Sequence, residues 1–341
     1  MSRFIPLETH PTQTQAEAAE WADSTRSSAQ ILPEGARLRD YEVAGCIGEG
    51  GFGIVYLAWD PAMAEHVAVK EFLPATLASR AHASPSVVIK SQRHVDSFRR
   101  GMRSFINEAR TLSQFDHPAL VKVLNFWEAN GTVYMAMPYY VGPTLAEALA
   151  ERGHAPDEAT LREWLHPLLD VLEMLHAANC FHRDIAPDNI LITDDGPVLL
   201  DFGAARRVID SEASSPTVVF KPGFTPIEQH SQVATMKQGA WTDLYALAGV
   251  VYSAITGNSP APSIDRLMDD RLRPLSELAR GRYSKAFLAT IDAALALHPR
   301  DRPQSVAEFR ERLGHEIVRE PPPPPAPIGS IAPTAPITPT A

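Results

Sequence analysis

The apolar period of the sequence changes once along the chain, and this change limits the fold more than any other feature. Residues 41–72 alternate between apolar and polar side chains, which is typical of strands joined by tight turns. Residues 105–115 have helical spacing, and residues 120–140 have the pattern of a hairpin that turns at Asn130-Gly131. After about residue 143 the period is helical, as in the run that Gly257 ends. The sequence therefore predicts an α+β fold with two lobes, a small β-rich lobe with one main helix and a larger helical lobe.

Composition excludes some partners. The chain has 341 residues and 45% apolar content, enough to bury a sizeable core. Its 31 Lys and Arg against 41 Asp and Glu give a formal net charge of -10, whereas a phosphate backbone or an anionic membrane attracts a basic face. No nucleic-acid partner is therefore expected, and any phosphate must be held by local groups.

Three features predict a cytoplasmic protein. Residues 1–15 lack the apolar core of a signal peptide. The run Leu244–Ile255 is too short to span a bilayer. Cys46 and Cys180 are far apart among apolar residues, which suggests buried structural thiols in a reducing compartment.

Both ends of the chain differ from the middle. Residues 1–36 lack sustained periodicity and are expected to form a flexible arm. Residues 319–341 are rich in proline, which favours extended polyproline II. This tail fits two interpretations, a linker to further sequence or a ligand for a partner domain.

A glycine-rich loop lies in the first lobe. It has the pattern G-x-G-x-x-G and contains Gly48, Gly50, Gly51, Phe52 and Gly53. The pattern also occurs in dinucleotide-binding folds, where it opens a helix. Here it runs into IVYLAW, a β-branched and aromatic strand, so the glycines form the bend of a hairpin. Such glycines let backbone N–H groups approach phosphates closely.

Two charged residues, Lys70 and Glu108, are expected to pair inside the protein. Lys70 follows three apolar residues on a half-buried strand, so it needs a partner. Glu108, on the apolar-adjacent side of a helix, is the expected one, and the pair would hold the amine ready for α- and β-phosphate oxygens.

The segment HRDIAPDNI, residues 182–190, carries a second polar set. Asp184 and Asn189 lie on a loop, because Pro187 prevents a continuing helix. A carboxylate that accepts a hydroxyl proton and an amide oxygen that binds Mg²⁺ suit a metal-bound triphosphate. Asp201, after an apolar strand, is the second candidate for the metal, although an aspartate capping a buried turn would look the same.

Five motifs stand together in kinase order: G-x-G-x-x-G-x-V at 48–55, V-A-V-K at 67–70, Glu108, H-R-D-x-x-x-x-N at 182–189, and D-F-G at 201–203. Over residues 38–315 the chain resembles the eukaryotic-type protein kinases, most closely the bacterial Ser/Thr kinases. The resemblance implies a kinase domain at residues 37–318, with an N-lobe at 37–138 and a C-lobe at 143–318. It also implies ATP and Mg²⁺ as cofactors, Ser or Thr hydroxyls of protein substrates as acceptors, and autophosphorylation.

Roles for single residues follow from the same resemblance. Asp184 would orient the hydroxyl, Asn189 and Asp201 would hold the metal, and Lys70 with Glu108 would position ATP. The residues implied in adenine binding are Val55, Ala68, Met137, Pro138, Tyr140 and Leu191. The residues implied in a hydrophobic spine between the lobes are Leu112, Val123, His182 and Phe202. Asp243 would brace the catalytic loop, and Arg302 would pair with Glu228 at the end of the activation segment.

The chain departs from the family pattern in three places. Residues 71–104 form a long insertion that is either solvated or a docking or regulatory surface, with residues 86–91 as one strand of a hairpin and 98–105 as a basic prelude to the helix. The usual A-P-E ends here as Pro226-Ile227-Glu228. Ala186 replaces the lysine that Ser/Thr kinases carry two residues after the catalytic aspartate.

Lys221 aligns with the activation-segment position that faces the missing lysine, and the hypothesis is that it supplies this charge. A solvated lysine is the alternative. Arg183 could pair with a phosphate on that segment, for which Thr217, Ser214 and Ser215 are the candidates. The competing function is a nucleotide-binding pseudokinase that acts as a regulatory scaffold.

Overall fold

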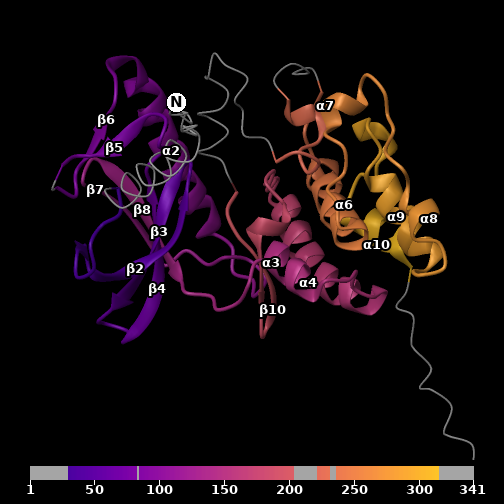
Figure 1. Ribbon diagram of the computed structural model, residues 1–341, viewed down its shortest axis with the longest axis horizontal. Helices are drawn as coiled ribbons and strands as arrows, with labels where there is room; N and C mark the ends of the chain where they lie inside the picture. Colours follow the sequence, from indigo (N-terminus) through magenta and orange to yellow (C-terminus); the bar gives the residue numbers. More distant parts are fainter. Residues whose placement is uncertain (1–29, 83, 203–220, 231–235, 315–341) are drawn as a thin grey trace, which may run out of the picture.

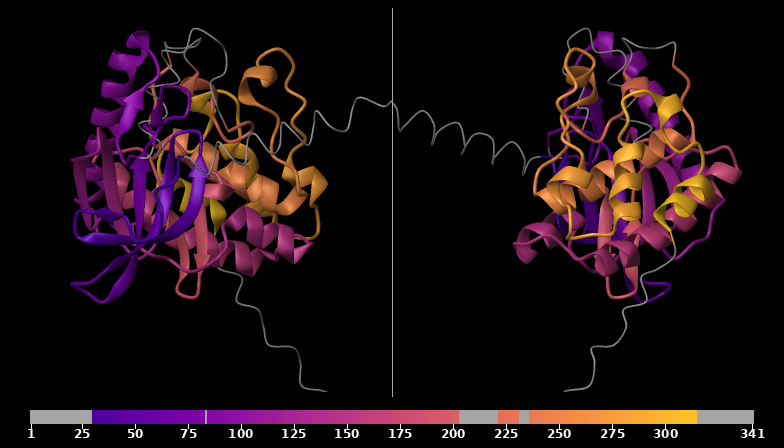
Figure 2. Two further views of the ribbon diagram at one scale, coloured as in Figure 1. Left: turned by 60° about the vertical axis from the view of Figure 1, so that its left-hand side comes forward. Right: turned by 90° about the vertical axis from the view of Figure 1, so that its right-hand side faces the viewer.

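The computed structural model describes residues 30–82, 84–202, 221–230 and 236–314. Two lobes lie side by side, with the strands of the first lobe at the left of Figure 1 and the helices of the second at the right. In the left view of Figure 2 the strands of the first lobe lie at the left and the helices of the second lobe at the right, whereas in the right view the second lobe lies in front of the first. The predicted α+β fold with a β-rich lobe before a helical lobe is confirmed.

The N-lobe is built on a six-stranded antiparallel sheet with the order β1-β2-β3-β4-β8-β7. Its turn at Asn130-Gly131 has positive φ at both residues, 54° and 75°, as an Asn-Gly hairpin requires. The N-lobe elements are β1 Arg37–Leu38, β2 Tyr41–Gly50, β3 Gly53–Asp60, β4 Glu65–Phe72, β5 Ala78–Arg80, β6 Val87–Ile89, η1 Gln92–His94, α2 Val95–Leu112, β7 Asn125–Ala129 and β8 Thr132–Pro138.

Aromatic side chains show that this sheet curls. Tyr41 on β2 and Trp127 on β7 are separated by three strands in the sheet order, yet their rings stack with centroids 5.5 Å apart. Tyr134 on β8 stacks on Trp127 as well, with the same separation of 5.5 Å between ring centroids. The curled sheet therefore encloses one of its own faces. The other face carries Phe72, which packs against Phe98 and Phe105 of α2.

The insertion forms a hairpin of β5 and β6 and is fixed to the sheet by a buried charge network. Arg80 pairs with Glu71, which also accepts hydrogen bonds of 2.8 Å from the hydroxyls of Tyr56 and Tyr134. Glu71, Tyr56 and Tyr134 are fully buried. An arginine that neutralises a buried carboxylate cannot be removed cheaply. The arginine on β5 therefore completes the core, whereas Val88 on β6 is 47% exposed, so the hairpin is solvated on only part of its surface.

The insertion also touches two loops. The amides of Leu73 and Ala75 donate to the carbonyls of Phe52 and Gly51, at 3.1 and 3.0 Å, in the glycine-rich loop. The amide of Val87 donates to the carbonyl of Asn130, at 2.7 Å. The predicted strand at 86–91 is confirmed, but α2 begins at Val95, so the basic segment 98–105 lies within the helix rather than before it.

Two further expectations need correction. Residues 30–36 pack on the lobe, because Leu32 is buried and its amide donates to the Tyr56 hydroxyl at 3.3 Å. The flexible arm thus does not extend to residue 36. The thiol of Cys46 is exposed and that of Cys180 half-buried, because Cys46 lies on a solvent-facing position of β2.

The C-lobe is helical apart from one hairpin below the cleft. Gly257, at φ 73°, ends α6 as predicted. Within the described ranges, no helix is both long and apolar enough for a membrane span. The C-lobe elements are α3 Leu145–Arg152, α4 Glu158–Ala177, η2 Pro187–Asn189, β9 Ile190–Thr193, β10 Gly196–Leu199, η3 Ile227–Gln229, α6 Ala240–Thr256, α7 Ser263–Arg266, α8 Leu275–Leu278, α9 Lys285–Ala294, η5 Pro299–Asp301 and α10 Val306–Leu313.

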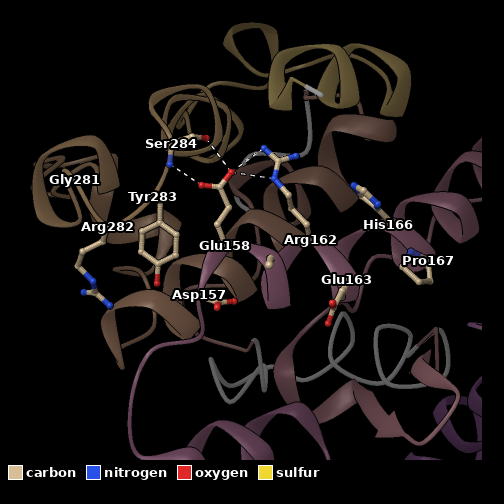
Figure 3. A pocket seen from close by; sticks show the side chains of 11 residues that line it. Asp157, Glu158, Arg162, Glu163, His166, Pro167, Gly281, Arg282, Tyr283 and Ser284 are labelled. Atoms are coloured by element: carbon tan, nitrogen blue, oxygen red, sulfur yellow. Dashed lines mark hydrogen bonds and ion pairs between the residues drawn. The ribbon is translucent and has the colours of Figure 1, made fainter. Parts of the chain in front are cut away.

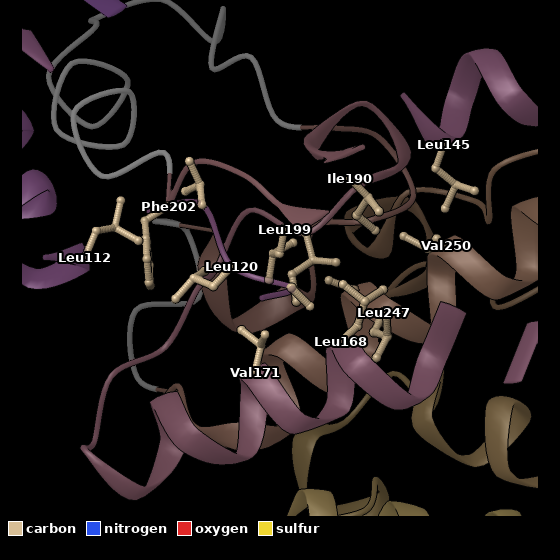
Figure 4. Packing of buried hydrophobic residues seen from close by; sticks show 14 of the residues in the cluster. Leu112, Leu120, Leu145, Leu168, Val171, Ile190, Leu199, Phe202, Leu247 and Val250 are labelled. Carbon is tan, nitrogen blue, oxygen red and sulfur yellow. The ribbon is translucent and has the colours of Figure 1, made fainter. Parts of the chain in front are cut away.

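A continuous apolar layer supports the segment between the lobes. In Figure 4, Leu168 of α4 and Leu247 of α6 pack below Ile190 and Leu199, which belong to the β9–β10 hairpin. The same layer continues to Phe202 near the N-lobe. The hairpin that follows the catalytic loop is therefore held by the C-lobe core.

Candidate active site

Asp243 at the start of α6 fixes the backbone of the catalytic loop. Its carboxylate accepts hydrogen bonds from the amides of His182, at 2.9 Å, and Arg183, at 2.7 Å, and contacts His176 Nε2 at 2.8 Å. Burial raises the pKa of Asp243, but the bond and charge of His176 outweigh it, so the pKa lies below its usual value. Arg183 has φ 65°, a strained conformation for a residue with a side chain, and these bonds hold it there. The predicted role of Asp243 agrees with this geometry.

Asp184 and Asn189 meet across a tight turn. The Asn189 amide nitrogen donates to Asp184 Oδ2 at 2.8 Å and to the Asp184 carbonyl at 2.7 Å. The backbone amide of Asn189 donates to the Ala186 carbonyl at 2.9 Å, which closes the turn over Pro187. The amide oxygen of Asn189 is consequently the end turned away from Asp184, and it is the atom that a hard cation would use.

Lys70 forms an ion pair with Asp201, with 2.5 Å between Nζ and Oδ2. Glu108 is buried, with 5% exposure, and its charge acts on the same amine. Burial lowers the pKa of Lys70, but the charges of Asp201 and Glu108 raise it above the ordinary value. Burial likewise raises the pKa of Asp201, but Lys70, then His182 and Lys221, lower it overall. The amine and the carboxylate are therefore both charged at neutral pH.

The predicted hydrophobic spine is present in part. The rings of His182 and Phe202 stack with centroids 4.8 Å apart. Figure 4 shows Leu112 of α2 beside Phe202, so the contact crosses from one lobe to the other. Val123 is buried as well. The position of α2 is thus coupled to that of the catalytic loop through apolar packing.

The adenine candidates lie on facing strands and on the hairpin below them. Ala68 on β4 is paired with Met137 on β8, and both are buried. Val55 on β3 and Leu191 on β9 are half-buried, and Leu191 forms a bridge with Thr144 beyond the hinge. Pro138 ends β8, and Tyr140 follows two residues later, with its hydroxyl accepting a bond from the Lys122 amide at 3.2 Å.

The glycine-rich loop joins β2 to β3, as predicted, and Gly53 makes its closest backbone contact. A methyl group built on Gly53 would lie 2.1 Å from the carbonyl oxygen of Glu71, whereas one on Gly50 would meet nothing within 4 Å. Packing against β4 therefore requires glycine at Gly53. At Gly50 no contact with the described residues requires it.

Gly53→Ala should destabilise the N-lobe by about 1–3 kcal/mol, because strands β3 and β4 must separate to admit the methyl group. Gly50→Ala is the matched control and should change the free energy of unfolding little. Chemical denaturation of the two variants measures the difference. Equal stabilities would contradict the close approach.

Lys221 reaches the catalytic loop. Its Nζ lies 2.9 Å from Oδ2 of Asp188, and its side chain is only 16% exposed. Asp188 lies between Pro187 and Asn189. Ala186, the position at which the resemblance implies a lysine, is fully buried. The amine of Lys221 is therefore held beside the turn that contains Ala186, and its charge acts on Asp201.

The end of the activation segment is clamped to the C-lobe. Glu228 and Arg302 form an ion pair, with 2.7 Å between Oε1 and Nη1, and both side chains are fully buried. The Thr242 hydroxyl donates to the same carboxylate at 2.9 Å. Displacement of the proline to Pro226 leaves this clamp intact, as expected. Gly203, Ser214, Ser215 and Thr217 lie outside the described residues.

A separate pocket of about 640 Å³ lies on the C-lobe, lined by the first half of α4 and the start of α9 (Figure 3). Its buried charges are already engaged. Glu158 accepts hydrogen bonds from Arg162 and from the amide and hydroxyl of Ser284. Arg162 also donates to the carbonyl of Leu313, at 2.9 Å. These groups tie three helices together, and the pocket contains no candidate catalytic residue.

Comparison with known proteins decides the family. The family model described as protein kinase domain matches residues 41–312. The chain belongs to the protein kinase family. The solved structure named PpkA-294, in its apo form, is 43% identical, with a TM-score of 0.77 over 84% of this chain and 100% of that one.

Bacterial relatives of this kinase domain are Ser/Thr kinases by name. PknK of Mycobacterium tuberculosis strain H37Rv is 30% identical over 276 residues, which cover 78% of this chain and 23% of PknK. PknA of Nostoc sp. strain PCC 7120 is 31% identical over 299 residues, 83% of this chain and 48% of PknA. The chain thus spans about a quarter to a half of the length of these curated relatives.

Sequence reasoning missed two residues of the kinase site. Asp188 is an acidic residue beside Asn189, but the sequence does not predict its ion pair with Lys221, which lies 33 positions away. His176 contacts Asp243 from α4, and its only sequence signal is its place at the end of an amphipathic helix. Lys70 was assigned to Glu108, whose charge acts on its amine, and the structure adds an ion pair with Asp201.

Proposed function

We propose that this chain is an ATP- and Mg²⁺-dependent protein Ser/Thr kinase that can autophosphorylate. The observation that carries the proposal is the convergence of the Lys70–Asp201 ion pair and the Asp184–Asn189 turn at the junction of the lobes. Phosphoryl transfer needs mainly positioning and charge neutralisation, and these are the groups that supply both. The names of the bacterial relatives support Ser and Thr as acceptors.

In the proposed reaction the acceptor hydroxyl oxygen forms a bond to the γ-phosphorus as the bond from phosphorus to the bridging oxygen of ADP breaks. Asp184 orients this hydroxyl and accepts its proton. Lys70, kept in place by the charge of Glu108, donates to phosphate oxygens. Val55, Ala68 and Leu191 would hold the adenine, and the Pro138 carbonyl and the Tyr140 amide would be available to hydrogen-bond it.

The donor atoms suit magnesium. Asp201 offers a carboxylate and Asn189 an amide oxygen turned away from Asp184. Within the described ranges no three His, Cys, Asp or Glu side chains cluster closely enough to hold a metal by themselves. Magnesium characteristically takes one or two carboxylates and completes its shell with phosphates and water. The ion would neutralise the charge that develops on the phosphoryl oxygens.

Lys221 is proposed to supply the cation that Ala186 lacks. It approaches the same turn from the activation segment, and its backbone is anchored there. The Lys221 carbonyl accepts bonds from the amides of Phe224 and Thr225, at 3.1 and 3.3 Å. Gly223, at φ 87°, packs against the Pro260 carbonyl so closely that a methyl group would lie 2.4 Å away.

Lys221→Ala should therefore lower the rate of phosphoryl transfer by about 10², the loss of one preorganised donor. Ala186→Lys in that background should restore most of the rate, since the two positions serve one role. Transfer is measured with radiolabelled ATP. An unchanged rate in Lys221→Ala would show that the Lys221 amine takes no part in transfer.

The competing function is a pseudokinase scaffold, which the alanine at 186 favours. Incubation of the protein with Mg²⁺ and γ-labelled ATP decides between the two. A kinase transfers label to itself or to an added protein substrate, and phosphoamino-acid analysis then finds phosphoserine or phosphothreonine. A scaffold binds ATP and remains unlabelled.

Regulation and partners are proposals of the same kind. The guanidinium of Arg183 lies over the ring of Phe181, 5.7 Å from its centroid. We propose that it pairs with a phosphate on Thr217, Ser214 or Ser215. Mass spectrometry after incubation with Mg-ATP locates the sites. The Pro-rich tail is proposed to link to further sequence or to bind a partner domain, and the protein is proposed to act in the cytoplasm.

A further inference from the structure

The ion pair between Asp188 and Lys221 joins two segments that are each rigid at the backbone. Asp188 lies in a turn closed by the bond from the Asn189 amide to the Ala186 carbonyl, with the φ of Pro187 fixed by its ring. Lys221 begins a second turn, whose Thr225 carbonyl accepts from the Ser263 hydroxyl at 2.7 Å. The flexible part of this link is therefore the lysine stem alone.

A lysine stem has considerable rotamer freedom, which it loses when its amine acts at one place. Without a fixed partner the amine of Lys221 would spend much of its time in solvent. The 2.9 Å contact with Asp188 removes that freedom before any nucleotide binds. Because Asp188 precedes Asn189, the contact keeps the amine next to a candidate metal ligand and two residues from Ala186.

We propose that Asp188 is a positioning residue, which holds the Lys221 amine where the γ-phosphate will lie. This inference rests on the proposed kinase function and on Lys221 as the replacement for the missing lysine. When Mg-ATP binds, the amine needs only to turn from the Asp188 carboxylate to a phosphate oxygen. Asp188 is 60% exposed, so this ion pair is weak enough to exchange.

The test uses Asp188→Asn in the full chain, with autophosphorylation measured over a range of Mg-ATP concentrations. The maximal rate should fall about fivefold, the scale of an exposed ion pair, while the Mg-ATP concentration for half-maximal rate stays the same. Asp195→Asn, in the exposed turn between β9 and β10, is the matched control for charge and should keep the full rate. Asp188→Glu should recover most of it.

Two double variants separate positioning from other effects. In Lys221→Ala the further change Asp188→Asn should have no effect, because the group to be positioned is absent. In Ala186→Lys the rate should no longer depend on Asp188. A merely structural role would lower the rate in every background and shift the unfolding midpoint.

Several outcomes overturn the inference. If the unmutated protein transfers phosphate and Asp188→Asn matches it or is faster, Asp188 does not position Lys221, and the kinase function stands. If Asp188→Asn slows the Lys221→Ala variant further, Asp188 likewise does not act through Lys221, and the kinase function again stands. If the unmutated protein transfers nothing, the proposed function fails, and the role of Asp188 fails with it.

Discussion

Asp184→Asn should lower phosphoryl transfer by about 10²–10⁴ while leaving ATP binding unchanged. The asparagine keeps the shape of the side chain and can still accept the bond that Asn189 donates at 2.8 Å. It cannot accept a proton, and general base catalysis typically contributes factors of this size. Label transfer from ATP measures the rate, and calorimetric titration with nucleotide measures binding.

The matched control for this variant is Asp194→Asn, which removes the same charge from an exposed turn. It should transfer phosphate at the full rate. If Asp184→Asn kept more than a tenth of the rate, Asp184 would not be the residue that orients the acceptor. If it lost ATP binding as well, its role would be structural.

Arg80→Ala should destabilise the protein by about 3–5 kcal/mol, because it leaves the carboxylate of Glu71 buried with no cation. The loss extends beyond one contact. Arg80 also donates to the carbonyls of Gln30 and Pro85, each at 2.6 Å, so it links three segments that are separate in sequence. Denaturant unfolding measures the change.

Arg99→Ala, which truncates an exposed arginine on α2, is the control and should change stability by less than about 0.5 kcal/mol. Combining Arg80→Met with Glu71→Gln should be less damaging than Arg80→Ala, since it removes the uncompensated charge. If Arg80→Ala unfolded like Arg99→Ala, the hairpin would be an appendage rather than part of the core.

Local patterns were enough to predict several parts of the molecule. The Asn130-Gly131 turn, the hairpin around the glycine-rich loop and the helix end at Gly257 each depend on a few neighbouring residues. The clamp between Glu228 and Arg302 was also predicted, although its members lie 74 residues apart, because each belongs to a recognisable motif. This pair was predicted from the resemblance to protein kinases, because the periodicity of apolar residues does not indicate contacts between distant segments.

Residues without a motif could not be paired from sequence. Nothing near Arg80 marks it as the partner of Glu71, since the contact depends on how the insertion folds back over the curled sheet. The charges of three carboxylates, Asp201, Glu108 and Asp184, act on Lys70, and which of them acts most strongly depends on their positions in space. Asp188 and Lys221 meet only because two turns on separate segments face each other.

The bonds from Leu73 and Ala75 to the glycine-rich loop affect how nucleotide can enter and leave. Carbonyls of Phe52 and Gly51 near the loop tip are already occupied, so the tip lifts only if those bonds break or the start of the insertion moves with it. The conformational entropy of this loop is therefore lost largely when the domain folds rather than at each binding event. Nucleotide residence time would then depend on Leu73 and Ala75, at the start of the insertion.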